Sequence, residues 1–489
     1  MGVDCLIIGP EEALESIRTH KPQGIIFSGG PAFVHQKDSP TISPKIFSCG
    51  IPILGICYGW QLTAQLLRGK VIAGQKEYGP AQLHMSAQSP LLQGITAQDF
   101  QVWMSHGDEV IKLPKGFEYL ASTPDVRAAV VADSTRQIYG VQFHPEVEHT
   151  QHGTVILRNF IENICSEKIQ IRAIDVEKII AAVRDKANAT GTSSRAIAAV
   201  SGGVDSTVAS ALVAKAIGKR FTPLYCDNGL MRVGTTAEVE HIFTDLLGVK
   251  PSILDCKEVF LEALRGKTDP EHKRIAIGNL YIRLFEQEAR KLPDVKFLVQ
   301  GTIYSDVIES KGTKHASKIK SHHNVGGLPA DMKLELLEPV RELYKDEVRE
   351  VGRQLGLPEA VLMKQPFPGP GQAIRILGEV TAERLAKQQQ ADQIVLEVLQ
   401  KMGWYEKVFQ SFPILSGALT TAVKGDGRVY GELVGLRVYD SSDIMTAGWT
   451  HLPYEVLQKI SSRIVNEVPG VSRVAYDITT KPPATMEWE

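Results

Sequence analysis

The sequence predicts an α/β protein: two successive α/β domains, each on a mainly parallel sheet, followed by a small C-terminal α+β domain. Short apolar runs such as "GIIFSGGP" and "IPILGICYG" alternate with helical patterns in the first third of the chain, as is typical of buried parallel strands. The pattern resumes with "AIAAVSGG", "FTPLYCDNG" and "KFLVQGTI" and breaks at "KQPFPGPGQ", where neither a helix nor a central strand can continue. We therefore expect domains over residues 1–165, 172–365 and 366–489.

The composition excludes several classes of function. The 489 residues are 43% hydrophobic and 22% charged, with a formal net charge of −2, which are ordinary values for a globular protein of several domains. Such a balanced charge argues against a nucleic-acid or membrane-surface partner. The six cysteines are scattered without a CxxC pair, and no run of 18 apolar residues occurs. We expect free thiols, no membrane span and a cytoplasmic location.

The stretch "ILGICYGWQ" places Cys57 between Gly55 and Gly59, after an apolar strand and before a helical pattern. This G-x-C-x-G arrangement is the thiol form of the nucleophile elbow, in which flanking glycines allow a turn sharp enough to expose the nucleophile. The amino end of a helix also favours the reactive thiolate. "GVQFHPEV" supplies His144 as a base and Glu146 to orient its imidazole. We therefore predict a catalytic triad of Cys57, His144 and Glu146 rather than a buried structural cysteine.

These motifs resemble the class I glutamine amidotransferase family, which hydrolyses glutamine and passes on the ammonia. The resemblance implies a flavodoxin-like first domain with an oxyanion hole, for which the "SGGP" loop offers N–H groups. The residues that it assigns are Gly30 and Tyr58 for the oxyanion, and Gln61 with Ser105, His106 and Gly107 of the "SHGD" loop for glutamine. The family usually has one more strand before the segment that corresponds to "GVDCLIIGP". We therefore expect a domain that lacks its first strand.

The stretch "AIAAVSGGVDST" looks like a phosphate-binding loop without the lysine that a γ-phosphate site uses. Its glycines allow close backbone approach, its hydroxyl groups donate hydrogen bonds, and the following helix start favours an anion. Asp205 makes sense beside phosphate if a Mg²⁺ ion bridges the two. The loop resembles that of the ATP pyrophosphatase family, which cleaves ATP between the α and β phosphates. The resemblance implies an adenine-nucleotide alpha-hydrolase-like domain and an ATP site of Ser201, Gly202, Gly203, Val204, Asp205, Ser206 and Thr207.

Two other features of the predicted second domain have alternative interpretations. Asp227 ends the predicted strand "FTPLYCD", where it could contact adenine or magnesium, or cap the next element. His315, His322 and His323 lie in the basic run "ESKGTKHASKIKSHHNVGG". Adjacent histidines without spaced partners make a poor zinc site, and the family resemblance implies a mobile lid over ATP instead.

Four further stretches, "GTIYSDVIES", "IKSHHNVGGLP", "QPFPGPGQAIRILGEV" and the terminal "KPPATMEWE", resemble the glutamine-hydrolysing GMP synthetase family. The resemblance covers nearly the whole chain. It implies a carbon–nitrogen ligase of purine biosynthesis, which adenylates xanthosine 5'-phosphate (XMP) and replaces the adenylate with ammonia to give GMP, AMP and pyrophosphate. It assigns XMP contacts to Arg274, Lys481 and Glu487. It also implies ATP and Mg²⁺ as cofactors, and a homodimer formed through the third domain.

Three alternatives compete with this interpretation. The chain could be an ATP pyrophosphatase that amidates or thiolates another substrate such as a tRNA base, but that function needs a basic surface, and the near-neutral charge argues against one. It could be a GMP synthetase that uses only free ammonia, if the missing strand impairs the glutaminase. A non-catalytic nucleotide-binding regulator would not need Cys57, His144, Glu146 and Asp205 together.

Overall fold

The computed structural model describes residues 2–489 except 31, 148, 171–172, 312–333, 425, 442–445 and 482. Contacts between Cα atoms divide the chain into two compact units. The first contains Met1–Ala173, Ser441–Gly448 and Thr479–Met486, and the second contains Ile174–Asp440, Trp449–Ile478 and Glu487–Glu489. Whether the second unit divides near residue 366 stays a prediction. His315, His322 and His323 lie outside the described residues.

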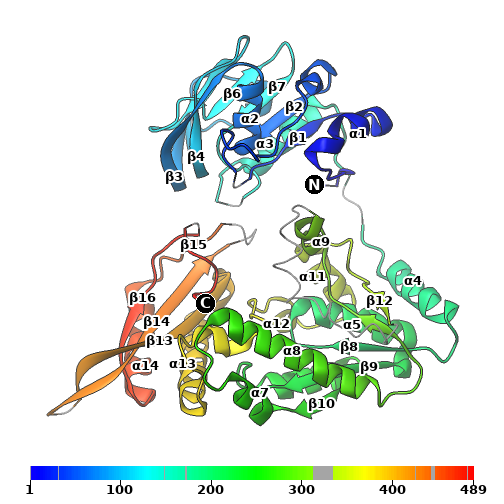
Figure 1. Ribbon diagram of the computed structural model, residues 1–489, viewed down its shortest axis with the longest axis vertical. Coiled ribbons are helices and arrows are strands. Elements are labelled where there is room, and N and C mark those ends of the chain that lie inside the picture. Colours follow the sequence, from blue (N-terminus) through cyan, green and yellow to red (C-terminus); the bar gives the residue numbers. More distant parts are fainter. Residues whose placement is uncertain are drawn as a thin grey trace. The chain divides into compact units, whose positions relative to one another are not determined.

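The first unit is built on a seven-stranded sheet in the order β1-β2-β7-β6-β5-β3-β4 (Figure 1). The strands are β1 (Ile25–Phe27), β2 (Ile53–Ile56), β3 (Lys70–Met85), β4 (Asp99–Lys112), β5 (Glu118–Ser122), β6 (Val130–Asp133) and β7 (Ile138–Val141). The helices are α1 (Ala13–His20), α2 (Tyr58–Leu66) and α3 (Gly153–Asn159). Residues 2–9 form neither helix nor strand.

Parallel pairing in this sheet is confined to β1, β2 and β7, whereas β6, β5, β3 and β4 pair antiparallel. The sequence predicts mainly parallel strands, and the structure shows a mixed sheet. The reason is the connections: β6 and β7 are joined by a short turn, whereas a parallel crossover needs a dozen or more residues. The predicted nucleophile lies in the parallel part of the sheet. It stands between β2, in which every residue is buried, and the first residue of α2.

The second unit contains a five-stranded sheet in the order β10-β9-β8-β11-β12, and all of its strands are parallel as predicted. The strands are β8 (Arg195–Ala199), β9 (Phe221–Asp227), β10 (Ser252–Asp255), β11 (Val295–Val299) and β12 (Glu335–Leu337). The helices are α4 (Val176–Ala189), α5 (Val204–Ile217), α6 (Thr235–Glu240), α7 (Lys257–Leu264), α8 (Pro270–Ala289), α9 (Tyr304–Lys311), α11 (Lys345–Gln354) and α12 (Glu359–Leu362). The core between α5 and the sheet includes Val208, Leu212 and Phe297.

The same unit holds a smaller sheet of β13 (Gln410–Lys424), β14 (Gly427–Asp440), β15 (Gly448–Trp449) and β16 (Val471–Tyr476). Helices α13 (Ala382–Lys401) and α14 (Tyr454–Glu467) pack against it, with Val395, Leu436 and Ile460 fully buried between them. The far ends of β13 and β14 extend away from the rest of this sheet in Figure 1. The α+β arrangement agrees with the class predicted for the C-terminal region.

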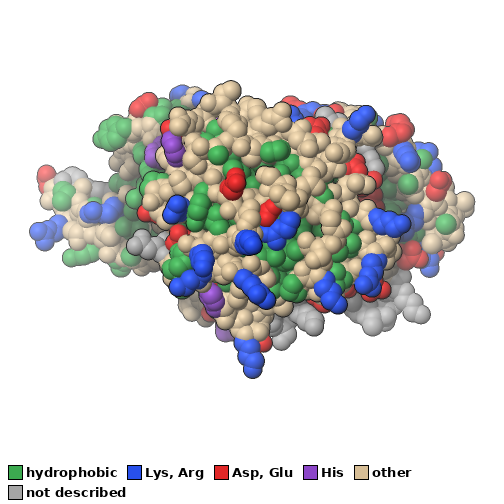
Figure 2. All heavy atoms as spheres, turned by 90° about the horizontal axis from the view of Figure 1, so that it is seen from above, with side chains coloured by type: hydrophobic (Ala, Val, Ile, Leu, Met, Phe, Trp, Pro, Cys, Tyr) green, Lys and Arg blue, Asp and Glu red, His purple; other side chains and the backbone are tan. Residues whose placement is uncertain are grey.

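Charged side chains of both signs are mixed with apolar ones on the face shown in Figure 2. This mixture agrees with the balanced composition. None of the helices in the described ranges is long and apolar enough to cross a membrane.

Candidate active sites

The turn between β2 and α2 has the sharp geometry that a nucleophile elbow requires. Cys57 has φ 49° and ψ −107°, a conformation that residues other than glycine seldom adopt. A Cβ added at Gly59 would lie 2.2 Å from the carbonyl oxygen of Phe27, and one at Gly55 would lie 2.7 Å from the backbone nitrogen of Trp60. Both glycines of the motif are therefore needed for the backbone to turn at Cys57.

His144 and Glu146 form an ion pair next to this turn. Nδ1 of His144 lies 2.7 Å from Oε1 of Glu146, and Cys57 is close enough to act on the pKa of the imidazole. Burial lowers the pKa of His144, but the hydrogen bonds and negative charges of Cys57 and Glu146 outweigh burial and raise it from 6.5 to about 10. A Cβ added at Gly29 would lie 2.7 Å from Cε1 of His144. The structure therefore brings the three predicted residues together beside the "SGGP" loop.

The "SHGD" segment, which the sequence predicts as a loop, lies within strand β4 and against the same turn. The carbonyl oxygen of Ser105 accepts a hydrogen bond from Sγ of Cys57 at 3.5 Å. The buried Gln61 donates through Nε2 to the carbonyl oxygen of Asp108 at 2.8 Å, which fixes α2 to this strand. His106 lies between that same carbonyl oxygen, 3.1 Å from Nδ1, and Oε2 of Glu77, 3.2 Å from Nε2.

The remaining predicted residues of this site have different surroundings. Gly107 is closely packed, because a Cβ there would lie 2.7 Å from Cε1 of Phe33. Gly30 is exposed and a Cβ there would meet nothing within 4 Å. The phenol of Tyr58 donates to the carbonyl oxygen of Pro40. Oxyanion binding by the N–H groups of Gly30 and Tyr58 stays a prediction.

Gln142 is a residue of this site that no sequence pattern revealed. Its Nε2 donates to Sγ of Cys57 at 3.8 Å, and its side chain is completely buried. It lies inside the quoted "GVQFHPEV", two residues before His144. The residue type alone gave no signal, because a buried glutamine is usually a structural hydrogen-bonding residue.

The predicted phosphate loop connects the carboxyl end of β8 to the amino end of α5. Gly202 has φ 75°, which glycine adopts readily. The hydroxyl groups of Ser206 and Thr207 donate to the carbonyl oxygen of Gly203 at 3.1 and 2.8 Å, and the N–H of Gly203 points to Oγ of Ser201 at 3.4 Å. The strand, the loop and the helix follow in the predicted order, so α5 presents its amino end at the loop.

Two lysines that the sequence analysis did not predict lie at this loop. Nζ of Lys345, at the start of α11, lies 2.6 Å from both carboxylate oxygens of Asp205. Nζ of Lys364 lies 3.3 Å from the carbonyl oxygen of Gly202 and 2.5 Å from Oε2 of Glu238. A loop without a lysine of its own therefore has two lysines supplied by other parts of the chain.

Asp227 has partners that fit the capping interpretation. Its Oδ2 accepts from the hydroxyl of Thr236 at 2.9 Å and pairs with Nζ of Lys257 at 3.0 Å. Its Oδ1 accepts from the N–H of Gly229 at 3.3 Å. These contacts occupy both oxygens with protein groups, while the predicted contact with adenine or magnesium stays untested.

The end of the chain is anchored by buried cations. Arg375, which is 0% exposed, donates to both carboxylate oxygens of Glu487 at 3.0 and 2.8 Å. Its guanidinium lies over the rings of Phe367 and Phe412, 4.8 and 4.0 Å from their centroids. Nε2 of Gln410 also donates to Glu487, at 3.2 Å. The predicted XMP-contacting Glu487 is therefore held in one orientation.

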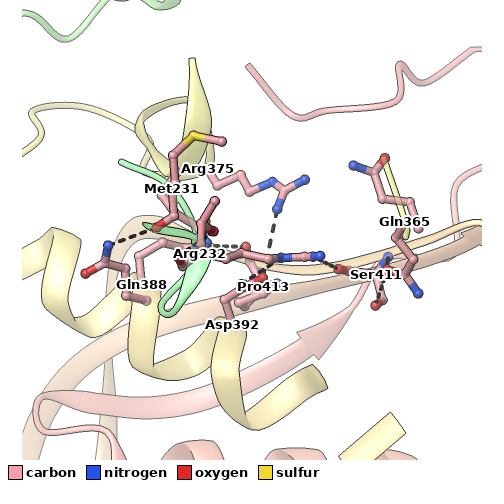
Figure 3. Close-up of polar contacts among 12 residues, drawn as sticks. Met231, Arg232, Gln365, Arg375, Gln388, Asp392, Ser411 and Pro413 are labelled. Atoms are coloured by element: carbon pink, nitrogen blue, oxygen red, sulfur yellow. Dashed lines mark hydrogen bonds and ion pairs between the residues drawn. The ribbon is translucent and has the colours of Figure 1, made fainter. Parts of the chain in front are cut away.

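Around Arg375 lies a cluster of polar side chains, drawn in Figure 3. Nε of Arg232 donates to Oδ2 of the buried Asp392 at 3.0 Å, and its Nη2 donates to the carbonyl oxygen of Ser411 at 3.2 Å. Nη1 of Arg375 lies 3.9 Å from Oδ1 of the same aspartate. These residues are far apart in the sequence, so no local pattern could have predicted the cluster.

The other two predicted XMP residues lie in different places. Arg274 donates through Nη2 to the backbone oxygen of Glu489, and so contacts the end of the chain. Lys481 belongs to the first unit, where its backbone pairs with that of Ala447 through hydrogen bonds of 2.8 and 3.0 Å. Their predicted contacts with XMP stay untested.

Comparison with known families agrees with these sites. Residues 1–164 match the family described as "Glutamine amidotransferase class-I", residues 175–308 match "NAD synthase", and residues 397–488 match "GMP synthase C terminal domain". The fold and the sites thus define a class of protein: a class I glutamine amidotransferase joined to an ATP-using pyrophosphatase.

Full-length relatives narrow this class to one family. The chain is 49% identical to a glutamine-hydrolysing GMP synthase of Nitratiruptor sp. over 100% of this chain and 95% of the relative. It is 51% identical to one of Symbiobacterium thermophilum over 96% and 90%, and 47% identical to one of Clostridium botulinum over 100% and 95%. The chain belongs to the glutamine-hydrolysing GMP synthase family. The α/β class and the family predicted from the sequence are both confirmed.

Proposed function

We propose that this chain converts XMP to GMP by forming an adenylated XMP with ATP and displacing the adenylate with ammonia taken from glutamine. AMP, pyrophosphate and glutamate are the other products. The observation that carries the proposal is the grouping of Cys57 with the His144–Glu146 ion pair, in a chain that also contains the "SGGVDST" loop. A nucleotide-binding regulator would need neither the strained cysteine nor its charged partner.

In the glutaminase reaction, Sγ of Cys57 attacks the carboxamide carbon of glutamine as a thiolate. His144 takes the thiol proton and gives it to the nitrogen that leaves as ammonia. Its raised pKa favours the imidazolium that this transfer needs. N–H groups of Gly30 and Tyr58 stabilise the oxyanion, and water then releases glutamate from the thioester.

In the adenylation reaction, the loop Ser201–Thr207 holds the phosphates that leave as pyrophosphate. Lys345 and Lys364 supply positive charge at this loop, as their distances to Asp205 and Gly202 support. Departure of pyrophosphate builds negative charge on its oxygens, and preorganised cations stabilise that charge. ATP use follows from the family, and the roles of these two lysines are part of the proposal.

Asp205 fits a Mg²⁺ ion held jointly with ATP. Its carboxylate is 29% exposed and ends in the loop, paired with Lys345. Mg²⁺ is usually held by one or two carboxylates together with substrate phosphates and water. Within the described part of the chain no group of three or more His, Cys, Asp and Glu side chains could hold a metal alone. When bound, the ion would neutralise phosphate charge.

For XMP we propose contacts with Arg274, Lys481 and Glu487. The fixed orientation of Glu487 on Arg375 supports its role, because a carboxylate that recognises hydroxyl groups must be positioned in advance. Arg274 and Lys481 supply the positive charge that the phosphate of XMP requires.

We also propose a homodimer formed through the smaller sheet of the second unit. The β13–β14 hairpin exposes Leu419, Val423 and Tyr430 at 72%, 73% and 72%. Apolar side chains that project together from a hairpin are typical of an interface. The match of residues 397–488 to the C-terminal domain of GMP synthases supports the proposal.

The test measures GMP formed from XMP, ATP and Mg²⁺ with either glutamine or ammonium chloride as the nitrogen source. We expect product with both sources, and we expect Cys57→Ala to abolish glutamine use while leaving ammonia use intact. The exposed Cys49 provides a matched control, since Cys49→Ala should change neither rate. No GMP with ammonium chloride would refute the proposed reaction. If the wild type forms GMP with ammonium chloride but not with glutamine, only the glutaminase part of the proposal is refuted.

A further inference from the structure

We propose that Gln142 is a further catalytic residue of the glutaminase site. Its Nε2 stabilises the thiolate of Cys57, and its Oε1 accepts an N–H of the carboxamide nitrogen that leaves as ammonia. The proposal rests on the proposed role of Cys57 as the nucleophile, and the experiment below separates the two.

Gln142 is held beside the nucleophile by its position in the sheet. It directly follows β7, the strand that pairs with β2, and its backbone N–H donates to the carbonyl oxygen of Ala129 at 2.9 Å. Its side chain is 0% exposed. The amide is therefore fixed beside the elbow, and Nε2 lies 3.8 Å from Sγ of Cys57.

The two protonation states of the sulfur need different hydrogen-bond partners. As a thiol, Cys57 donates to the carbonyl oxygen of Ser105 at 3.5 Å. A thiolate can no longer donate, and a carbonyl oxygen facing it is repulsive. The N–H of Gln142 then provides a donor to the negative sulfur, and hydrogen bonds to ionised groups are about twice as strong as neutral ones. Gln142 therefore favours the thiolate, together with the His144–Glu146 pair.

The oxygen atom of the Gln142 amide also supports a role in catalysis. Oε1 of Gln142 is buried and has no hydrogen-bond partner among the described residues. A buried acceptor without a partner is costly and is rare in native structures. It shares a carbon with the Nε2 that faces the nucleophile, so it lies beside the reaction centre. A glutamine substrate brings in two N–H donors on its carboxamide nitrogen.

The chemical step is balanced without a proton on Gln142. The C–S bond forms at the carboxamide carbon, the C–N bond breaks, and His144 gives the nitrogen its third proton. Gln142 only donates one hydrogen bond to sulfur and accepts one from nitrogen. The hydrogen bond to sulfur increases the fraction of thiolate before the attack, and the hydrogen bond from nitrogen strengthens in the transition state as His144 protonates that nitrogen.

The experiment compares Gln142→Met, which has a similar shape but no polar atoms, with Gln142→Glu, which keeps an acceptor and loses the donor. The control is Gln88→Met on the exposed surface. We expect Gln142→Met to lower kcat/KM for glutamine roughly 10- to 100-fold, the effect of one lost hydrogen bond to a charged group. Ammonia-driven GMP synthesis should stay unchanged. The rate of Cys57 alkylation by iodoacetamide, measured without glutamine, should fall in both Gln142 variants and stay at the wild-type value in the control.

Two results would overturn the proposal: an unchanged glutamine rate in Gln142→Met, or a lowered glutamine rate with unchanged alkylation, since the latter would mean that Nε2 of Gln142 does not stabilise the thiolate. If Gln142→Met also loses ammonia-driven synthesis, the substitution has affected more than the glutaminase site. The alkylation rate of Gln142→Glu then tests the proposal: a lowered rate supports it, and an unchanged rate overturns it. Retention of glutamine use by Cys57→Ala would instead overturn the proposed nucleophile.

Discussion

Replacement of Glu146 by glutamine tests the electrostatics of the proposed glutaminase site. The substitution keeps the shape of the side chain and removes the charge that lies 2.7 Å from Nδ1 of His144. One pKa unit corresponds to about 1.4 kcal/mol, so the rise from 6.5 to about 10 is a net effect of about 5 kcal/mol, in which Cys57 and Glu146 together outweigh the opposing cost of burial. The carboxylate of Glu146 is 37% exposed, so solvent weakens its share. We assign it about 1 to 2 kcal/mol, which predicts a loss of roughly 5- to 30-fold in kcat/KM for glutamine.

The pH dependence gives the sharper test. The folded pKa of His144 lies above its ordinary value, so the imidazolium is stabilised at low pH and is lost as the pH rises through about 10. Without the Glu146 charge this loss moves toward pH 6.5. Glutaminase activity of Glu146→Gln should therefore decline at a lower pH than that of the wild type, while ammonia-driven GMP synthesis is unaffected. The exposed Glu162→Gln serves as the control. If glutaminase activity declines at the same alkaline pH in the variant and the wild type, the Glu146 charge does not set the pKa of His144.

Three further predictions concern the second unit. Asp205→Asn should abolish XMP-dependent pyrophosphate release with glutamine and with ammonia alike, because it removes the carboxylate proposed for Mg²⁺; a retained rate would exclude that role. Lys273→Met should lower the free energy of unfolding by about 3 kcal/mol in a urea titration, because the lysine is 0% exposed and pairs with Glu489 at 2.5 Å. The exposed Lys250→Met is the control, and equal unfolding midpoints in the two variants would contradict this prediction. Leu419→Asp combined with Tyr430→Asp should convert a dimer to a monomer in sedimentation velocity, and a wild-type monomer would refute the proposed interface.

The parts of the fold that the sequence predicted are those with local signals. The buried runs of β2 and β8 each end in a glycine-containing turn and a helix, so both sites could be placed on elements in advance. The antiparallel arm of β3 and β4 was not anticipated. Its pairing joins strands across a long connection, and the register shifts between Ala73 and Glu77 interrupt the regular alternation that marks a strand.

The same distinction separates the site residues that were predicted from those that were not. Cys57, His144 and Asp205 have the residue types that their chemistry demands, within short motifs of known geometry. Lys345 reaches Asp205 across 140 positions of sequence, and Arg375 reaches Glu487 across 112. Contacts of that kind depend on the order of strands in a sheet, which no local pattern contains.

The two lysines also change the interpretation of the phosphate loop. From the sequence, the absence of a lysine in "SGGVDST" distinguished this site from one that transfers a γ-phosphate. In the structure, Lys345 enters from α11 and pairs with Asp205, while Lys364 contacts the backbone of the loop. Because Lys345 is bound to the carboxylate proposed for Mg²⁺, an arriving Mg–ATP would have to separate this ion pair and leave the ammonium free for phosphate. The affinity for Mg–ATP would then contain the cost of breaking the pair, so Lys345→Met should strengthen Mg²⁺ binding at Asp205 while slowing pyrophosphate release.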